Sequence, residues 1–318
     1  MEKVGGNAFW GCTGLVSVTI MKGTTKIGDE AFLNCTGLTS VTILEGTTEI
    51  GENAFSGCTG LTSLTILKGV TEIGSEAFMD CTGLINATLL EGTTQIRDNA
   101  FSGCTGLTRA VIPEGVTEIG ENAFFNCTGL TSVVMPDGMT KIGNWAFSAC
   151  EGLTSVTVPE GVTEIGENAF WHCTGLSGVS IPNSVTKIGS EAFSGCESLT
   201  SVTIPEGVTE IRDNTFSDCT GLTSIAIPAG VTRIGDCAFW GCARLGSVTL
   251  PEAVTEIGDW AFQDCTGLDS IVIPRNVEKI GKTVFENCRP ALIAPHISIN
   301  DFAPVDKLGA VRGFAKLY

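Results

Sequence analysis

Cysteine is the residue type with the most chemical potential in this chain, and it recurs at a fixed spacing. Thirteen of the fourteen cysteines stand 23 residues apart, from Cys12 to Cys288. On adjacent parallel strands, which lie about 4.8 Å apart, such residues would be close enough for a disulfide. However, the series has an odd number of members, and the sequence around each cysteine is the same whether or not a partner would be available. We therefore expect reduced, buried thiols that pack as small hydrophobic side chains.

The cysteines and histidines offer little for metal binding. No Cys-x-x-Cys or Cys…His spacing typical of a zinc site is present. Cys237 stands outside the series and is either exposed and reactive or simply tolerated at a surface position. The two histidines, His172 and His296, occur in unrelated contexts. The sequence therefore predicts no metal site and no cofactor.

Carboxylates are abundant but evenly distributed. Glu160, Glu164 and Glu167 have counterparts in many of the other 23-residue segments, which is typical of a solvated face. A catalytic acid–base pair needs two carboxylates in unequal environments, whereas a repeat supplies equal ones. We predict no catalytic residue and do not expect an enzyme.

The composition excludes two further classes of function. The chain has 318 residues, a net charge of −17 and a pI near 4.4. It lacks the positive surface that binds phosphate backbones, so we exclude nucleic acid as a partner. Its apolar runs are only a few residues long, which is too short for a transmembrane segment. No signal peptide is visible before the repeats, which begin near Val4.

The elements that position these residues follow from the same period. Thirteen phenylalanines share it, from Phe9 to Phe285, without an insertion. A fixed period of this length is typical of a solenoid, in which each unit is one supersecondary element stacked on its neighbours. We predict a solenoid of about thirteen 23-residue units over residues 1–295. Residues 296–318 lack the repeat and are predicted to be a C-terminal cap or the start of a truncated helical segment.

Residues 150–172 illustrate one unit. The pattern L-x-x-V-x-V of residues 153–158 predicts a strand that ends at Pro159, because proline cannot donate a hydrogen bond to a neighbouring strand. A second short extended stretch ends at Ile165. Residues 167–170 are predicted to form a single helical or 3₁₀ turn, since acidic side chains precede the apolar ones, as at a helix start.

The repeated pattern L-x-x-V-x-I-P-x-x-V-x-x-I-G-x-x-A-F-x-x-C resembles the BspA-like (Treponema-type) leucine-rich repeat. The resemblance implies an α/β-type repeat solenoid, a curved right-handed coil with a parallel β-sheet on its concave side. Short second strands and single helical or 3₁₀ turns would form the other side. It also implies recognition of proteins or host surfaces, as by surface antigens of that family. The residues that illustrate the match are Ala192, Phe193, Cys196, Leu199, Val202, Ile204, Pro205, Val208 and Ile211.

The exposed positions of the predicted strands carry a ladder of Ser and Thr. Asn86, Arg109, Gly178 and Asp269 interrupt this ladder, and a partner could be recognised at such interruptions. Small hydroxylic and β-branched residues also suit a crowded sheet face without any function, and a flat Thr array could order water or ice. The candidate binding residues on this face are Asn86, Arg109, Ser155, Thr157 and Asp269.

The position after each phenylalanine alternates between large and small side chains. Met79, Phe125 and Trp171 occur 46 residues apart with serines between them, and Trp240 occupies the same position in a later unit. If exposed, this aromatic stripe would be a binding surface or a contact for self-association. Alternatively, each large side chain folds over the small serine of the neighbouring coil.

Together these patterns predict a solenoid for non-catalytic protein recognition or scaffolding, with a protein partner that the sequence does not identify. The alternatives are a cell-surface adhesin that binds host matrix proteins, a structural spacer, and a water-ordering protein. Reduced cysteines would favour a cytoplasmic location, whereas the family resemblance favours a cell surface.

Overall fold

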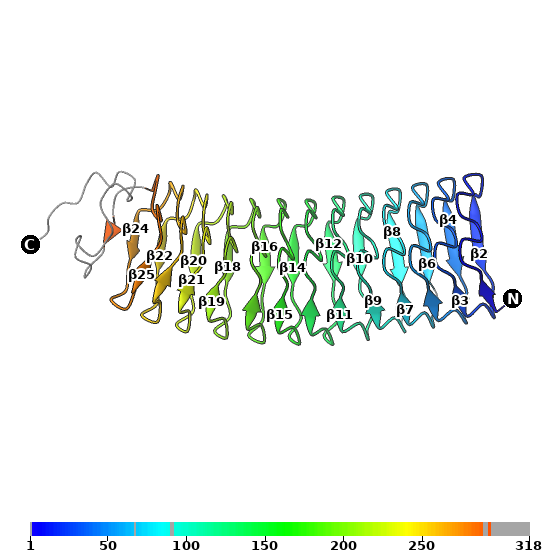
Figure 1. The fold of residues 1–318 in the computed structure, drawn as a ribbon, viewed down its shortest axis with the longest axis horizontal. Helices are drawn as coiled ribbons and strands as arrows, with labels where there is room; N and C mark the ends of the chain where they lie inside the picture. The colour runs from blue at the N-terminus through cyan, green and yellow to red at the C-terminus, as the bar shows by residue number, and fades with distance from the viewer. Residues whose placement is uncertain (1, 67, 90–91, 289–291, 294–318) are drawn as a thin grey trace, which may run out of the picture. The chain divides into compact units, whose positions relative to one another are not determined.

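The computed structural model describes residues 2–66, 68–89, 92–288 and 292–293. The chain divides into two compact units, unit 1 (Met1–Val162) and unit 2 (Thr163–Tyr318). Within each unit, the chain completes one coil every 23 residues, and each coil contributes a longer and a shorter β-strand (Figure 1). The described residues contain no helix that could span a membrane.

The longer strands alternate between outward hydroxyl groups and inward aliphatic side chains, because successive residues of a strand point to opposite faces. Each pairs in parallel with a strand one coil away, so that Ser17 lies opposite Ser40 and Ile20 opposite Ile43. The longer strands of unit 1 are β2 (Ser17–Ile20), β4 (Ser40–Ile43), β6 (Ser63–Ile66), β8 (Asn86–Leu89), β10 (Arg109–Val111), β12 (Ser132–Val134) and β14 (Ser155–Thr157). Those of unit 2 are β16 (Gly178–Ser180), β18 (Ser201–Thr203), β20 (Ser224–Ala226), β22 (Ser247–Thr249), β24 (Ser270–Val272) and β26 (Leu292–Ile293).

The shorter strands form a second parallel ladder in each unit. Their isoleucines lie opposite one another, as Ile27 lies opposite Ile50. The shorter strands of unit 1 are β1 (Lys3–Val4), β3 (Lys26–Ile27), β5 (Glu49–Ile50), β7 (Glu72–Ile73), β9 (Gln95–Ile96), β11 (Glu118–Ile119) and β13 (Lys141–Ile142). Those of unit 2 are β15 (Glu164–Ile165), β17 (Lys187–Ile188), β19 (Glu210–Ile211), β21 (Arg233–Ile234), β23 (Glu256–Ile257) and β25 (Lys279–Ile280).

The segment that precedes each cysteine is not the predicted helical or 3₁₀ turn, and the described residues contain no helix at all. In residues 53–58, the N–H groups of Asn53, Phe55 and Gly57 donate to carbonyls of the next coil at 2.8–3.0 Å. The intervening N–H groups donate to the carbonyl three residues earlier. Asn53 and Gly57 have φ values of 53° and 68°, which a right-handed helix does not admit. The prediction was wrong because this segment forms a third ladder between coils.

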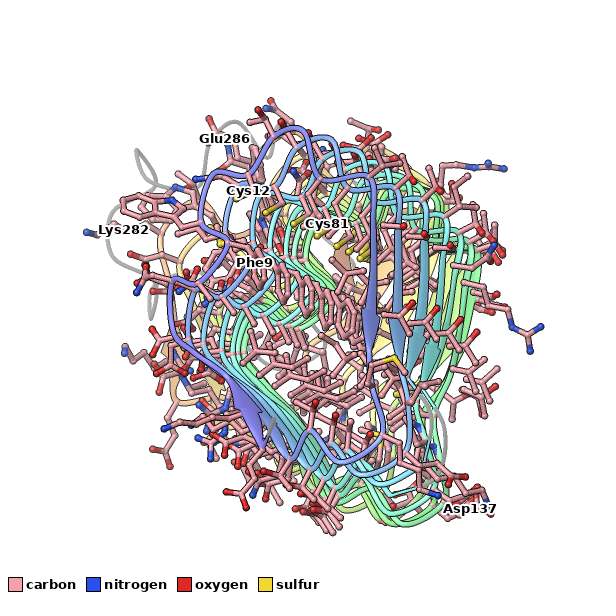
Figure 2. The ribbon with its side chains drawn as sticks, turned by 90° about the vertical axis from the view of Figure 1, so that its right-hand side faces the viewer. Phe9, Cys12, Cys81, Asp137, Lys282 and Glu286 are labelled. Carbon is pink, nitrogen blue, oxygen red and sulfur yellow. The ribbon has the colours of Figure 1, made fainter. Side chains whose placement is uncertain are left out.

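The interior of each unit contains the residues that share the 23-residue period. Neighbouring phenylalanine rings are stacked, with centroids 4.9–5.4 Å apart in unit 1 and 5.1–5.8 Å apart in unit 2. Phe32 to Phe262 are buried in every coil, together with the Leu, Ile and Ala of the repeat. Figure 2 shows Phe9 and Cys81 on the inner side of the coil backbone.

The predicted repeat solenoid with parallel strands is therefore confirmed in both units. The curvature and the concave position of the longer strands stay predictions. The predicted cap, residues 296–318, lies outside the described residues.

Candidate binding site

The outer face of the longer strands mostly carries serine and threonine. In unit 2, Gly178, Ala226 and Val272 depart from this pattern on strands that are not neighbours, whereas one part of unit 1 departs from it on three consecutive strands. Strands such as β4 and β6 carry a serine and a threonine on this face, with aliphatic residues buried beneath them. In β8, β10 and β12 the pattern changes to Asn-Ala-Thr, Arg-Ala-Val and Ser-Val-Val. These three strands are neighbours in one parallel sheet, so the departures from the pattern form one patch.

Two of the predicted binding residues meet in this patch. Asn86 and Arg109 are directly opposite each other on β8 and β10, and both are exposed. Ser132 of β12 lies on the other side of Arg109 in the same row. Arg109 is the only charged residue in the longer strands that the structure describes.

Exposed aliphatic side chains lie beside this row. Val111 and Val134, at 41% and 46% exposure, are directly opposite each other on β10 and β12. They occupy positions that are threonine in most coils. A hollow of about 240 Å³ opens where these strands end, and its lining includes Leu89, Val111, Pro113, Glu114, Val134 and Pro136.

The charge of Arg109 is not neutralised within the described part of the chain, since no hydrogen bond or ion pair engages its guanidinium there. Several cations of the shorter strands behave differently, because they pair with glutamates one coil away. The Nζ of Lys26 is 2.6 Å from Oε1 of Glu49, and Nη1 of Arg233 is 2.6 Å from Oε1 of Glu210. The hydrogen bond that Lys26 donates to Glu49 raises the pKa of Lys26. Arg109 is thus available to a ligand in a way that these cations are not.

The other predicted strand-face residues lie outside this row. Ser155 and Thr157 are exposed on β14, beside β12, where they continue the ordinary Ser/Thr pattern. Asp269 belongs to unit 2 and directly precedes β24. Its N–H donates to the carbonyl of Gly246 at 2.9 Å. Asp269 therefore occupies the position directly before the strand, which is often threonine, and it does not lie in the row of serines that begins each longer strand. Their assignment as binding residues stays a prediction.

The predicted aromatic stripe is only partly accessible. In unit 1, Met79 and Phe125 are half-buried, and the serines at the same position of adjacent coils, Ser56, Ser102 and Ser148, are buried. This burial agrees with the alternative in which large side chains fold over small ones.

The same holds in unit 2. Trp171 and Trp240 are half-buried, while Ser194 and Ser217 are buried. The indole N–H of Trp240 donates to Oδ2 of Asp264 at 3.0 Å, which fixes the ring against its own unit. Self-association through this stripe stays a prediction. The exposed tryptophans are Trp10 and Trp260.

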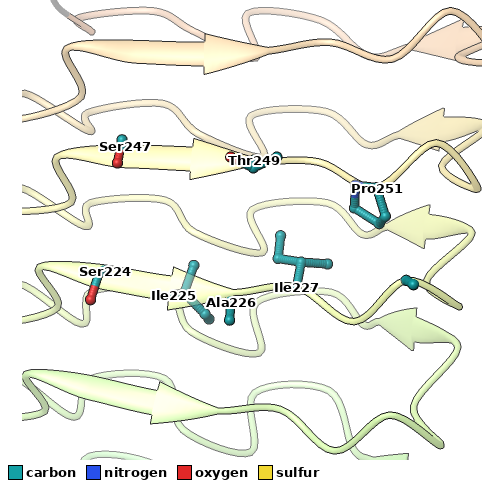
Figure 3. Close-up of a pocket in the computed structure, with 8 residues that line it drawn as sticks. Ser224, Ile225, Ala226, Ile227, Ser247, Thr249 and Pro251 are labelled. Carbon is teal, nitrogen blue, oxygen red and sulfur yellow. The ribbon is translucent and has the colours of Figure 1, made fainter.

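A second hollow lies on the strand face of unit 2, with a volume of about 460 Å³ (Figure 3). It arises because Ala226 and Ala229 replace larger residues of the repeat. Its lining has hydroxyl and aliphatic groups but no charged side chain, so it offers fewer specific contacts than the patch in unit 1. The lining includes Ser224, Ala226, Ala229, Ser247, Thr249 and Pro251.

The cysteines are placed for packing and not for chemistry. All fourteen are free, and eleven are buried. Most of them donate Sγ–H to the carbonyl of the phenylalanine in the preceding coil, as Cys127 does to Phe101 at 3.1 Å. Burial raises the pKa of Cys58 to about 12 and that of Cys127 well above its ordinary value, so neither forms the reactive thiolate near neutral pH. Among the described residues, no group of three or more His, Cys, Asp or Glu is arranged to hold a metal ion.

Sequence reasoning found Asn86 and Arg109 but missed the valines next to them. Val111 and Val134 fit the expected β-branched pattern of a strand, and only their exposure distinguishes them from core valines. The available signal was valine at a position that is threonine in most coils. Ile85, 47% exposed just before β8, carries the same signal.

Comparison with known proteins agrees with this architecture. The model of the BspA type leucine rich repeat region matches residues 2–131, 94–220 and 163–291. A leucine-rich repeat protein from Bacteroides ovatus is 31% identical, with a TM-score of 0.75 over 91% of this chain and 80% of that one. A leucine rich cell surface protein from Faecalibacterium prausnitzii is 32% identical, with a TM-score of 0.54 over 92% of this chain and 82% of that one.

A leucine-rich repeat protein from Eubacterium ventriosum, 24% identical, shares the fold with a TM-score of 0.58 over 89% of this chain and 84% of that one. No curated protein matches the chain. The family model covers nearly all of the repeats, and its pattern is the one that builds both units. The chain belongs to the BspA type leucine rich repeat family.

Proposed function

We propose that this protein is a non-catalytic recognition module that binds a protein partner through the strand face of unit 1. The binding surface is the Arg109 patch, which we define as Asn86, Arg109, Val111 and Val134. One observation carries the proposal: these four exposed residues replace the common serine and threonine on three neighbouring strands, so that the departures from the Ser/Thr pattern adjoin one another.

The composition of the Arg109 patch supports a protein as the partner. Binding surfaces for proteins combine apolar side chains that exclude water with a few polar groups, and arginine is enriched at the residues that dominate affinity. Here Val111 and Val134 supply the apolar area and Arg109 supplies the charge. The family is one of repeat proteins, whose extended surfaces serve interaction.

The other functions fit the strand face less well. A water-ordering array needs a regular row of hydroxyl groups, and Arg109, Val111 and Val134 interrupt that row in the middle of unit 1. A spacer would need no exposed valine or unpaired arginine on the face. A substrate pocket is not favoured either, because the hollow beside the valines is small and its one carboxylate, Glu114, is exposed.

Selection of displayed random peptides on the immobilised protein tests the proposal. The variant N86S/R109S/V111T/V134T restores the common residues of the repeat at the patch and should fold normally. The matched control, G178S/A226T, restores common residues in unit 2. We expect the selected peptides to bind the wild type and the control but not the patch variant. Peptides that bind all three proteins equally would contradict the proposal.

A second candidate is adhesion at a cell surface. It is favoured by the relative from F. prausnitzii, which is described as a cell surface protein. The same patch would then contact a partner outside the cell. Labelling of intact cells of the source organism with a membrane-impermeant amine reagent would test the location, since only a surface protein would be modified.

A further inference from the structure

We propose that the Arg109 patch recognises an acidic peptide segment, in which a carboxylate side chain is followed two residues later by an aliphatic one. This inference rests on the proposed function and names the chemistry of the partner. The carboxylate would bind Arg109, and the aliphatic side chain would lie over Val111 and Val134.

The charge of the patch supports the first part. Arg109 stands alone as a cation on the longer strands, and the described residues supply it with no carboxylate. The chain has a net charge of −17, so most of its surface repels an acidic segment, and an unpaired guanidinium provides a local exception. Arginine also binds carboxylates through two parallel hydrogen bonds, which adds directional specificity.

The neighbours of Arg109 can complete the polar contact. Asn86 lies directly opposite it on β8, and Ser132 lies opposite it on β12. An amide N–H and a hydroxyl can both donate to a carboxylate that is held at the guanidinium. The row across the three strands therefore contains donors on both sides of the charge.

The strand geometry supports the spacing. Arg109 and Val111 lie on the same face of β10, two residues apart, which corresponds to about 6.6 Å along the strand. An extended ligand has the same period, so a carboxylate at Arg109 places the side chain two residues away at the valines. The hollow of about 240 Å³, lined by Val111, Val134 and Pro136, can receive an aliphatic group.

Binding of defined peptides tests this inference. The probe is an N-acetylated, C-amidated, threonine-rich peptide that contains Asp-Thr-Leu, so that its aspartate is the only carboxylate. We expect replacement of this aspartate by asparagine to weaken binding about tenfold, because a charge-assisted hydrogen bond is lost. Moving the leucine next to the aspartate should also weaken binding, and added salt should weaken only the aspartate peptide.

Variants of the protein assign the effect to Arg109. R109S should remove the preference for aspartate over asparagine, whereas R275S, which removes an exposed arginine from a turn in unit 2, should not. R109E should prefer a peptide with Lys-Thr-Leu. Circular dichroism of each variant checks its fold, and within the described residues Arg109 makes no side-chain hydrogen bond or ion pair that the fold would lose.

The outcomes separate this inference from the proposed function. If selected peptides bind through the patch but neither carry acidic residues nor respond to R109S, the inference is overturned and the function stands. If neither the selected nor the defined peptides bind the wild type, both are overturned. Equal binding of the Asp-Thr-Leu and Asn-Thr-Leu peptides overturns the inference alone.

Discussion

At the scale of single residues, the cysteine series is a packing device. Most buried Sγ–H groups find a carbonyl acceptor in the preceding coil, as Cys196 does with Phe170 at 3.3 Å. A buried S–H group that donates a hydrogen bond favours the thiol over the thiolate. Burial itself also raises the pKa of Cys104 and Cys242. The sequence predicted reduced, buried thiols because their surroundings repeat, and eleven of the fourteen are buried in the structure.

Cys237 and Cys288 are both half-buried, and their pKa values shift in opposite directions. A hydrogen bond from Cys265 lowers the pKa of Cys288. Burial, reinforced by the nearby carboxylates of Asp236, Asp213 and Asp259, raises the pKa of Cys237. Cys288 should therefore reach the thiolate form at a lower pH than Cys237.

We expect iodoacetamide to alkylate Cys288 faster than Cys237 near neutral pH, with the two rates converging only once the pH exceeds the raised pKa of Cys237. Peptide mass spectrometry after timed quenching measures both sites in one sample. The denatured protein provides the control, because its cysteines have no folded environment. Faster alkylation of Cys237 at neutral pH would show that the causes given for the two pKa shifts are wrong.

At the scale of elements, the sequence predicted both strands of the coil but not the turn segment. The strands follow from alternating aliphatic residues and from proline, which are local signals. The segment Glu-Asn-Ala-Phe contains good helix formers, yet the N–H of Phe124 donates to Ala146 of the next coil at 2.8 Å. Such a bond between coils depends on the stack, so local propensity could not reveal it. The one local signal was asparagine, which tolerates the left-handed φ seen at Asn122.

The candidate site likewise contains residues that the sequence could predict and residues that it could not. Asn86 and Arg109 could be predicted because their residue types differ from serine. Val111 and Val134 could not be predicted, because valine and threonine are equivalent as strand formers. Only the position of a valine on the outer or the inner face of the strand distinguishes an exposed valine from a core valine. Their adjacency follows from the register between β10 and β12, which the 23-residue spacing implies once the strands are known to pair.

Glycine at the end of the shorter strand offers a test at this scale. A Cβ on Gly143 would lie 2.5 Å from the carbonyl oxygen of Ile119, so Gly143→Ala should force coils apart and lower the free energy of unfolding by about 1–3 kcal/mol. Where the chain itself has a side chain at this position, at Arg97, the N–H···O distance to Ile73 is 3.3 Å instead of the 3.0 Å at Gly143.

Gly178→Ala is the matched control, since a Cβ there meets no atom within 4 Å. Its stability should equal that of the wild type or exceed it slightly. Urea denaturation followed by circular dichroism compares the two variants. A Gly143→Ala variant as stable as Gly178→Ala would mean that the coils yield more easily than the close approach suggests.

At the scale of the whole molecule, each of the two units is a sum of similar contacts between its consecutive coils. Three backbone ladders, the phenylalanine stack and the cysteine hydrogen bonds all join a coil to the next one along the chain. No pairing between strands of the described residues skips a coil. Stability in such arrays depends on the number of coils and on the interface between neighbours, not on any particular coil.

Removal of one whole coil should therefore be tolerated. Deletion of residues 201–223 joins Thr200 to Ser224 and leaves the period intact. Cys242, which normally donates to the carbonyl of Phe216, would meet Phe193 instead, the acceptor that Cys219 uses in the intact chain. We expect a folded protein that unfolds cooperatively at a slightly lower urea concentration, because one interface between coils is lost.

Deletion of residues 212–223 is the informative control for the loss of a complete coil. It removes fewer residues, but it leaves a coil too short to close, so that donors and acceptors on either side no longer align. This shorter deletion should abolish cooperative unfolding, as measured by circular dichroism over a urea titration. If the shorter deletion were as stable as the longer one, the 23-residue period would not be the unit of stability, because the number of residues removed and not their register would then decide the outcome.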